Sequence, residues 1–120
     1  MNHCCLQIDV TLKVTAEEWF SRTEKGVATM RELPGLVWKL WLEPVEGKAG
    51  GLYLFKNLAA AKAYAEGPIV AGLRASTMVE NVTVRLLPIN DSLSRRTFGL
   101  PDEAGTIGSS DVATLGQAYV

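Results

Sequence analysis

Two apolar runs separated by a short polar loop constrain the fold most strongly. Residues 33–43 read LPGLVWKLWLE, and residues 49–55 read AGGLYLF. Each run places large apolar side chains at both odd and even positions, and successive side chains alternate between the two faces of a sheet. The runs therefore predict a β-hairpin whose two faces are both covered. We do not expect one chain of 120 residues to cover both faces by itself.

The overall composition predicts one soluble globular domain. The chain is 48% hydrophobic and has a formal net charge of -1, so it offers no electrostatic footprint for nucleic acid or an anionic membrane. Its apolar runs are shorter than the ~20 residues of a spanning helix, and its start lacks the pattern of a signal peptide. We therefore expect a cytoplasmic protein with neither a nucleic-acid nor a membrane partner.

The two cysteines, Cys4 and Cys5, are adjacent in sequence. Adjacent cysteines are poorly placed for a disulfide with each other, and two such residues supply too few ligands for a metal site. We expect them to pack as small apolar side chains, and we expect no metal site.

The first half of the chain predicts a strand and then a helix. Apolar and polar residues alternate over residues 4–14, as in a strand with one buried face. Thr15 and Glu18 have the spacing of a capping box, in which the hydroxyl and the carboxylate bond the free amides of a helix start. An apolar stripe follows and ends before Pro34, and we expect it to lie in the core: Trp19, Phe20, Val27, Met30 and Leu33.

The second half predicts two more helical segments and a last strand. Asn57 is a helix cap for the alanine-rich residues 58–66, and Pro68 suits the first turn of a further segment over residues 69–75. Strands are then expected at 4–14, 36–44, 50–56 and 78–89. This order, βαββαβ, predicts an α+β ferredoxin-like fold with helices on one face of an antiparallel sheet.

The sequence changes character near its end. From Asn90 onward, glycine and serine become frequent and no long periodic segment is present. We therefore divide the chain into a ferredoxin-like domain of residues 1–95 and a C-terminal extension of residues 96–120. The extension is expected to pack on a partner subunit.

Three segments resemble the YdhR family of monooxygenases. They are Pro-Gly-x-x-Trp-Lys-x-Trp at residues 34–41, Gly-Gly-x-Tyr-x-Phe at residues 50–55, and the pair Ala63-Tyr64. The resemblance spans about residues 4–95. It implies a dimeric α+β barrel, in which two ferredoxin-like subunits press their open sheet faces together. In this homodimer, the partner subunit would cover the face of the hairpin that the helices leave open.

The resemblance also implies an activity. The wider superfamily includes cofactor-free oxygenases of polyketide quinone chemistry and heme-degrading enzymes, so family membership fixes the fold better than the function. We expect a cofactor-independent monooxygenase that oxidises a small aromatic or polyketide-like phenol with dioxygen. The alternative is a non-enzymatic dimer, binding a small apolar ligand or associated with stress. A cavity of about 300 Å³ or more would favour a ligand site.

The candidate site residues concentrate in the hairpin. Such an oxygenase needs an apolar pocket with a few polar groups, and aromatic side chains could form its walls: Trp38, Trp41, Tyr53 and Tyr64. Asp9 or Glu43 is a candidate base, and Lys39 or Arg85 is a candidate stabiliser of a substrate anion. The competing interpretation is that the aromatics pack the core and the dimer interface, and that the charges pair with one another.

Strand alternation separates these candidates into two sets. Trp38 and Trp41 must point to opposite faces of a regular sheet. A site between sheet and helices favours Trp38 with Tyr64, whereas a site inside the dimer barrel favours Trp41 with Lys39 and Glu43. His3 is the sole histidine and lies at the terminus, so a histidine-ligated heme has no evident ligand.

Overall fold

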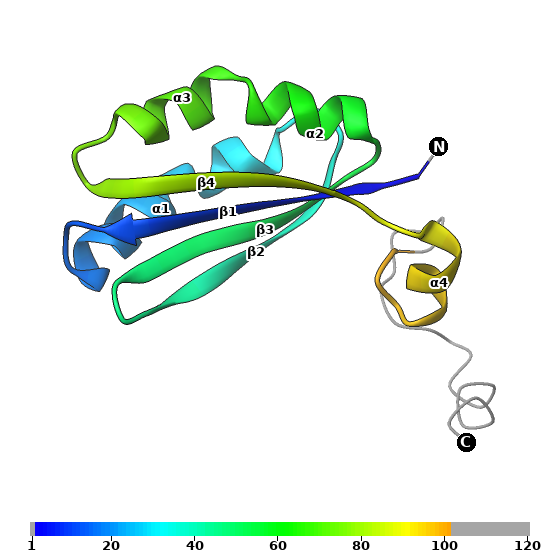
Figure 1. The fold of residues 1–120 in the computed structure, drawn as a ribbon, viewed down its shortest axis with the longest axis horizontal. Coiled ribbons are helices and arrows are strands. Elements are labelled where there is room, and N and C mark those ends of the chain that lie inside the picture. The colour runs from blue at the N-terminus through cyan, green and yellow to red at the C-terminus, as the bar shows by residue number, and fades with distance from the viewer. Residues whose placement is uncertain (1, 102–120) are drawn as a thin grey trace. The chain divides into compact units, whose positions relative to one another are not determined.

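The computed structural model describes residues 2–101, and its first unit is an antiparallel sheet with helices on one face (Figure 1). The elements are β1 (Cys4–Leu12), α1 (Ala16–Arg31), β2 (Leu36–Val45), β3 (Lys48–Phe55), α2 (Leu58–Ala65), α3 (Pro68–Ala75), β4 (Val79–Pro88) and α4 (Asp91–Arg96). The strands are ordered β2-β3-β1-β4. The chain therefore has the α+β ferredoxin-like βαββαβ fold, as its sequence predicts.

The core lies between the helices and one face of the sheet. On β1 the side chains of Cys4, Leu6, Ile8 and Val10 are buried, and those between them are partly exposed. In the antiparallel ladders Leu6 lies opposite Tyr53 of β3 and Leu86 of β4. The alternation of the first strand thus places its apolar half against the helices. Both cysteines are free thiols, and Cys4 packs in the core as expected.

The helices begin at the residues that their caps predict. The Thr15 hydroxyl accepts a hydrogen bond from the Glu18 amide at 3.1 Å, and the Asn57 side chain accepts one from the Ala60 amide at 2.8 Å. The capping box is only half formed, because the Glu18 carboxylate lies 3.5 Å from the Thr15 hydroxyl and accepts from it. In a complete capping box the Glu18 carboxylate would instead accept a hydrogen bond from the Thr15 backbone amide.

The stripe of α1 is only partly core. Trp19 is buried and Met30 packs against the core, but Phe20 and Val27 are 38% and 41% exposed. The expectation that the whole stripe is buried is therefore wrong. A helix laid over a sheet covers a narrower band than this stripe spans, and the two exposed side chains lie at the margin of that band.

A β-bulge in β2 decides which way its side chains point. Leu36 pairs with Phe55, yet the next pair is Trp38 with Leu54, so Val37 is an extra residue on the β2 side. Side chains from Trp38 to Leu42 are consequently shifted by one position relative to a regular ladder, and a second irregularity follows between Leu42 and Val45. Lys39 then lies opposite Tyr53, on the face that the helices cover.

The other face of the sheet is open within the first unit. It carries Trp38, Leu40 and Leu42 from β2, and Leu40 is 53% exposed. Contiguous apolar side chains on a sheet face are typical of an interaction surface. No helix among the described residues is long and apolar enough to cross a membrane.

The second unit, which begins at Asn90, contains a short helix that the sequence analysis did not predict. The Asn90 side chain accepts a hydrogen bond from the Leu93 amide at 2.9 Å and caps α4. A single capped turn needs no long periodicity, so the pattern search missed it. The predicted contact of the extension with a partner falls largely on residues 102–120, which lie outside the described residues.

Candidate functional site

A cavity of about 410 Å³ lies between α1 and the helix-covered face of the hairpin. Its floor comes from β1, β2 and β3, and its walls come from α1, α2 and α3. Most of its lining is apolar, and the side chains that matter for the argument are Trp19, Met30, Lys39, Trp41, Tyr53 and Tyr64. The volume lies within the range of small-molecule sites, about 300–1,000 Å³.

Lys39 is one of two cationic side chains that line this cavity, with Arg22. Its Nζ lies 3.4 Å from the centroid of the Trp41 ring and 4.5 Å from the centroid of the Tyr53 ring. Among residues 2–101, no carboxylate forms an ion pair with it. Burial therefore lowers the pKa of the Lys39 amine from 10.5 to about 7, because nothing compensates the charged form for its lost hydration.

Gly51 makes room for this lysine. It lies opposite Trp41 in the ladder, and a Cβ built on it would be 3.0 Å from Cε of Lys39. A side chain at this position would compete with the lysine stem for the same space. The absence of a side chain at Gly51 thus leaves space for the Lys39 stem beside the cavity.

Two tyrosine hydroxyls meet at the cavity wall. Tyr53 on β3 and Tyr64 on α2 have their hydroxyl oxygens 3.2 Å apart, and the Tyr64 hydroxyl donates to Sδ of Met30 at 3.7 Å. Burial raises the pKa of both phenols, and for Tyr53 the neighbouring Tyr64 adds to the effect. Both groups therefore stay protonated near neutral pH and act as hydrogen-bond donors or acceptors, never as anions.

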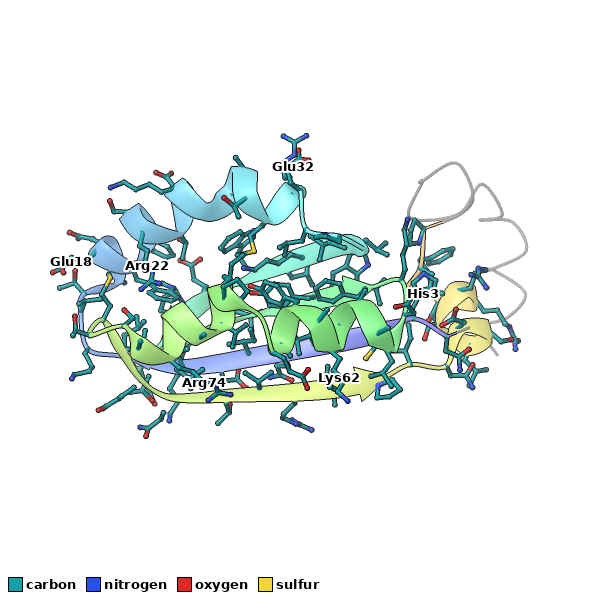
Figure 2. All side chains as sticks on the ribbon, turned by 90° about the horizontal axis from the view of Figure 1, so that it is seen from above. His3, Glu18, Arg22, Glu32, Lys62 and Arg74 are labelled. Carbon is teal, nitrogen blue, oxygen red and sulfur yellow. The ribbon has the colours of Figure 1, made fainter. Side chains whose placement is uncertain are left out.

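Polar side chains from α1 and β2 line the rest of the cavity. Arg22 donates to Oγ of Ser76 at 2.8 Å and stacks 5.8 Å from the centroid of the Trp19 ring. Figure 2 shows Arg22 between α1 and the C-terminal end of α3. Glu24 and Glu43 complete the ionisable lining. The cavity thus combines an apolar interior, one unpaired lysine and a polar margin.

The structure brings five of the eight predicted site residues together. The five that line the cavity are Lys39, Trp41, Glu43, Tyr53 and Tyr64. The other three, Trp38, Asp9 and Arg85, occupy ladder positions on the opposite face. There Asp9 accepts hydrogen bonds from Nε2 of Gln7 at 3.1 and 3.3 Å.

The expected grouping of aromatics is wrong in one respect. A site between sheet and helices was expected to use Trp38 with Tyr64, but the cavity there contains Trp41 and Lys39 instead. The physical reason is the bulge at Val37, which exchanges the faces of the β2 side chains from Trp38 to Leu42. Of the proposed bases and anion stabilisers, only Glu43 and Lys39 remain beside the cavity.

Sequence reasoning missed the contributions of α1. Arg22, Met30, Phe20 and Val27 all line the cavity, yet the apolar stripe was interpreted as core alone. A signal was available in the width of the stripe, since Phe20 and Val27 lie outside the band that Trp19 and Met30 define. Gly51 was also not linked to Lys39, because that contact crosses between strands.

The described residues hold no cluster of three or more histidine, cysteine or acidic side chains suited to a metal ion. His3 is not part of the cavity lining. Figure 2 places it at the opposite end of the sheet from Arg22, and its carbonyl oxygen accepts a hydrogen bond from the Ile89 amide at 3.2 Å.

Comparison with known proteins assigns the chain to a family. Residues 5–100 match the model of the family described as "Putative mono-oxygenase ydhR". This match spans most of the chain, which therefore belongs to the YdhR family, as the hairpin motifs predict. No curated protein matches the sequence.

Solved structures share the fold at low sequence identity. A protein of unknown function from Nitrosomonas europaea is 17% identical with a TM-score of 0.62, over 74% of this chain and 90% of that one. SnoaB, a cofactor-independent oxygenase from Streptomyces nogalater, is 14% identical with a TM-score of 0.59, over 75% and 95%. A heme-degrading protein from Mycobacterium tuberculosis is 18% identical with a TM-score of 0.51, over 74% and 93%. These similarities establish the fold, and the substrate of this chain has to be inferred from its own cavity.

Proposed function

We propose that the chain is a cofactor-independent monooxygenase that oxidises a small aromatic or polyketide-like phenol with dioxygen. The observation that carries the proposal is the unpaired Lys39 amine inside an apolar, aromatic-walled cavity. Membership of a monooxygenase family and the fold shared with a cofactor-independent oxygenase support it. The cavity volume of about 410 Å³ accommodates a ligand of two or three fused rings.

Lys39 supplies both a base and a counter-ion in this scheme. With a pKa of about 7, a large share of the amine is neutral at physiological pH and can accept the phenol or enol proton. The ammonium that results then stabilises the substrate anion in a medium of low dielectric constant. The Tyr53 and Tyr64 hydroxyls remain protonated, and one of the pair can donate a hydrogen bond to the same oxygen.

The oxidation draws its electrons from the substrate. In an anthrone, the methylene carbon of the anion is attacked by dioxygen, a C–O bond forms, and loss of water leaves a carbonyl. The carbon gives up four electrons, which reduce one oxygen atom to the new carbonyl oxygen and the other to water. The Lys39 proton returns to the departing oxygen, so the amine is neutral again at the end of the cycle.

We further propose that the open face of the sheet pairs with a second copy of the chain. Trp38, Leu40 and Leu42 would be buried there, and an obligate interface of this kind covers on the order of 2,000 Å². This assembly leaves the cavity on the helix side of each subunit. The dimer and the chemistry are therefore separable by mutation.

Oxygen consumption with a panel of phenols and anthrones, measured in metal-free buffer, tests the activity. We expect uptake by the wild type, a loss of at least about tenfold in Lys39→Met, and a smaller loss in Trp41→Phe. Trp38→Phe is the matched control, because Trp38 lies on the opposite face from the cavity.

Two outcomes would count against the proposal. Absence of oxygen uptake by the wild type with every substrate, together with tight binding of the same compounds, would favour a non-enzymatic ligand-binding protein. Equal losses in Trp38→Phe and Trp41→Phe, with the fold intact by circular dichroism, would place the chemistry away from the cavity.

A further inference from the structure

One lysine amine sits in an apolar cavity without an anionic partner. The ionisable groups around it are Arg22 and Glu24 on α1, Glu43 on β2, Tyr53 on β3 and Tyr64 on α2. Within residues 2–101, neither glutamate forms an ion pair with Lys39, and its only described contacts are with the Trp41 and Tyr53 rings. The nitrogen is thus not occupied by a bond that a ligand would have to break.

We propose that Lys39 captures small aromatic aldehydes and ketones in this cavity as a covalent imine. The Nζ atom attacks the carbonyl carbon, a C–N bond forms, and the carbon–oxygen bond breaks. Both amine protons leave with the carbonyl oxygen as water, and no electrons are exchanged with any third reactant. The product is a Schiff base whose protonated form occupies the place of the ammonium.

The surroundings of Lys39 favour each step of this reaction. Burial lowers its pKa to about 7, so about half of the amine has a free lone pair at neutral pH. An aromatic carbonyl compound can pack against the apolar lining, where little water competes for the imine. The iminium cation keeps its place over the Trp41 face, which binds a delocalised cation as it binds an ammonium.

The tyrosine pair can assist the loss of water. Dehydration of the intermediate amino alcohol needs a proton donor near its oxygen. The Tyr53 and Tyr64 hydroxyls line the same cavity and stay protonated, since burial raises the pKa of both. The Tyr64 hydroxyl can donate either to Sδ of Met30 or to Tyr53, and in the second arrangement the Tyr53 proton is available to the intermediate.

The other five lysines differ from Lys39 in their environment. Lys13, Lys25, Lys48, Lys56 and Lys62 are all exposed, and none of them lines this cavity. Selective reaction at Lys39 is therefore the signature of the proposal. This capture requires no dioxygen, so it goes beyond the proposed oxygenase activity and is tested separately from it.

Reductive trapping provides the test. The full chain is incubated at pH 7 with 2-naphthaldehyde and sodium cyanoborohydride, and peptide mapping by mass spectrometry follows the modification of each amine over time. We expect Lys39 to be modified at least about tenfold faster than any exposed lysine. The N-terminal amine, which the reagents also modify, serves as an internal reference.

Variants separate the site from general reactivity. Lys48→Met should retain the rapid adduct, whereas Lys39→Arg, which keeps the positive charge but cannot form an imine, should lose it. Modification of Lys39 no faster than that of Lys48 in the wild type would overturn the proposal, and this measurement does not depend on any variant folding. An adduct at Lys39 without oxygen uptake supports capture while the oxygenase proposal fails; oxygen uptake with an unreactive Lys39 gives the reverse result.

Discussion

Lys39 shows how the residue type and its position together lower the pKa of a buried amine. A buried ammonium normally needs a carboxylate or several hydrogen bonds to offset its lost hydration. Here the aromatic faces of Trp41 and Tyr53 provide the only described compensation, and cation–π contacts contribute less than desolvation removes. The folded protein therefore carries an electrostatic cost at Lys39, as functional sites often do.

Replacing Lys39 should reveal this cost as a pH-dependent change in stability. Its pKa is about 7 in the folded state, whereas the ordinary value for a lysine is 10.5. Between these values the unfolded chain binds more protons, so the free energy of unfolding of the wild type rises with pH through this window. Lys39→Met lacks this term. We expect the variant to gain most in stability relative to the wild type at pH 6, and the difference to shrink by pH 9.5.

Urea unfolding at pH 6, 8 and 9.5 measures the effect. The remaining ionisable groups of the cavity are common to both proteins and largely cancel in the difference. Lys48→Met, which removes an exposed lysine outside the cavity, is the matched control. A pH-independent difference for Lys39→Met would show that Lys39 is not desolvated in the folded protein.

At the scale of the elements, alternation, caps and turn residues predicted most of the fold. The strand at 4–14, the caps at Thr15 and Asn57, and the hairpin all correspond to observed elements. These signals are local, because hydrogen bonds and side-chain periodicity within a few residues determine them. The short helix α4 was missed because one capped turn has no period to detect.

The face of the sheet to which each β2 side chain points could not be predicted in the same way. The sequence correctly separates Trp38 from Trp41, but which of them meets the helices depends on the extra residue at Val37. A bulge is set by pairing with another strand, and nothing in the hairpin sequence marks Val37 as unpaired. The composition of the site was thus largely predictable, whereas its side of the sheet was not.

Substitution by alanine should change the free energy of unfolding in opposite directions at two glycines. Gly72 lies within α3, has no neighbouring atom within 4 Å of a built Cβ, and has no positive φ. Gly72→Ala should therefore raise the free energy of unfolding by about 0.5–1 kcal/mol. Gly35 has a φ of +78°, and its Cβ would lie 2.7 Å from Cβ of Ala60.

Gly35→Ala should accordingly lower the free energy of unfolding by about 1 kcal/mol or more. Urea denaturation of both variants at one pH provides the measurement. If the two substitutions changed the free energy of unfolding in the same direction, the backbone conformation assigned to Gly35 or to Gly72 would be incorrect.

At the scale of the whole molecule, the open sheet face predicts the assembly. We expect light scattering to give twice the chain mass of 13.0 kDa. Leu40→Glu should shift the equilibrium to monomer, because the carboxylate would have to be desolvated against the partner. Leu58→Glu is the matched control, since Leu58 is 48% exposed on α2, in the helix layer away from the open sheet face. A wild-type monomer at micromolar concentration, or equal dissociation in both variants, would contradict the proposed interface.

The extra residue at Val37 also affects how this chain should be compared with its relatives. At 14–18% identity to the solved structures, an alignment can place a gap on either side of that position at almost equal score. One choice equates Lys39 with a neighbour's cavity residue, and the other equates it with a residue of the outer face. Comparison of cavity residues within this family must therefore follow superposed strand pairing, because an alignment offset by one residue would compare cavity side chains with side chains of the open sheet face.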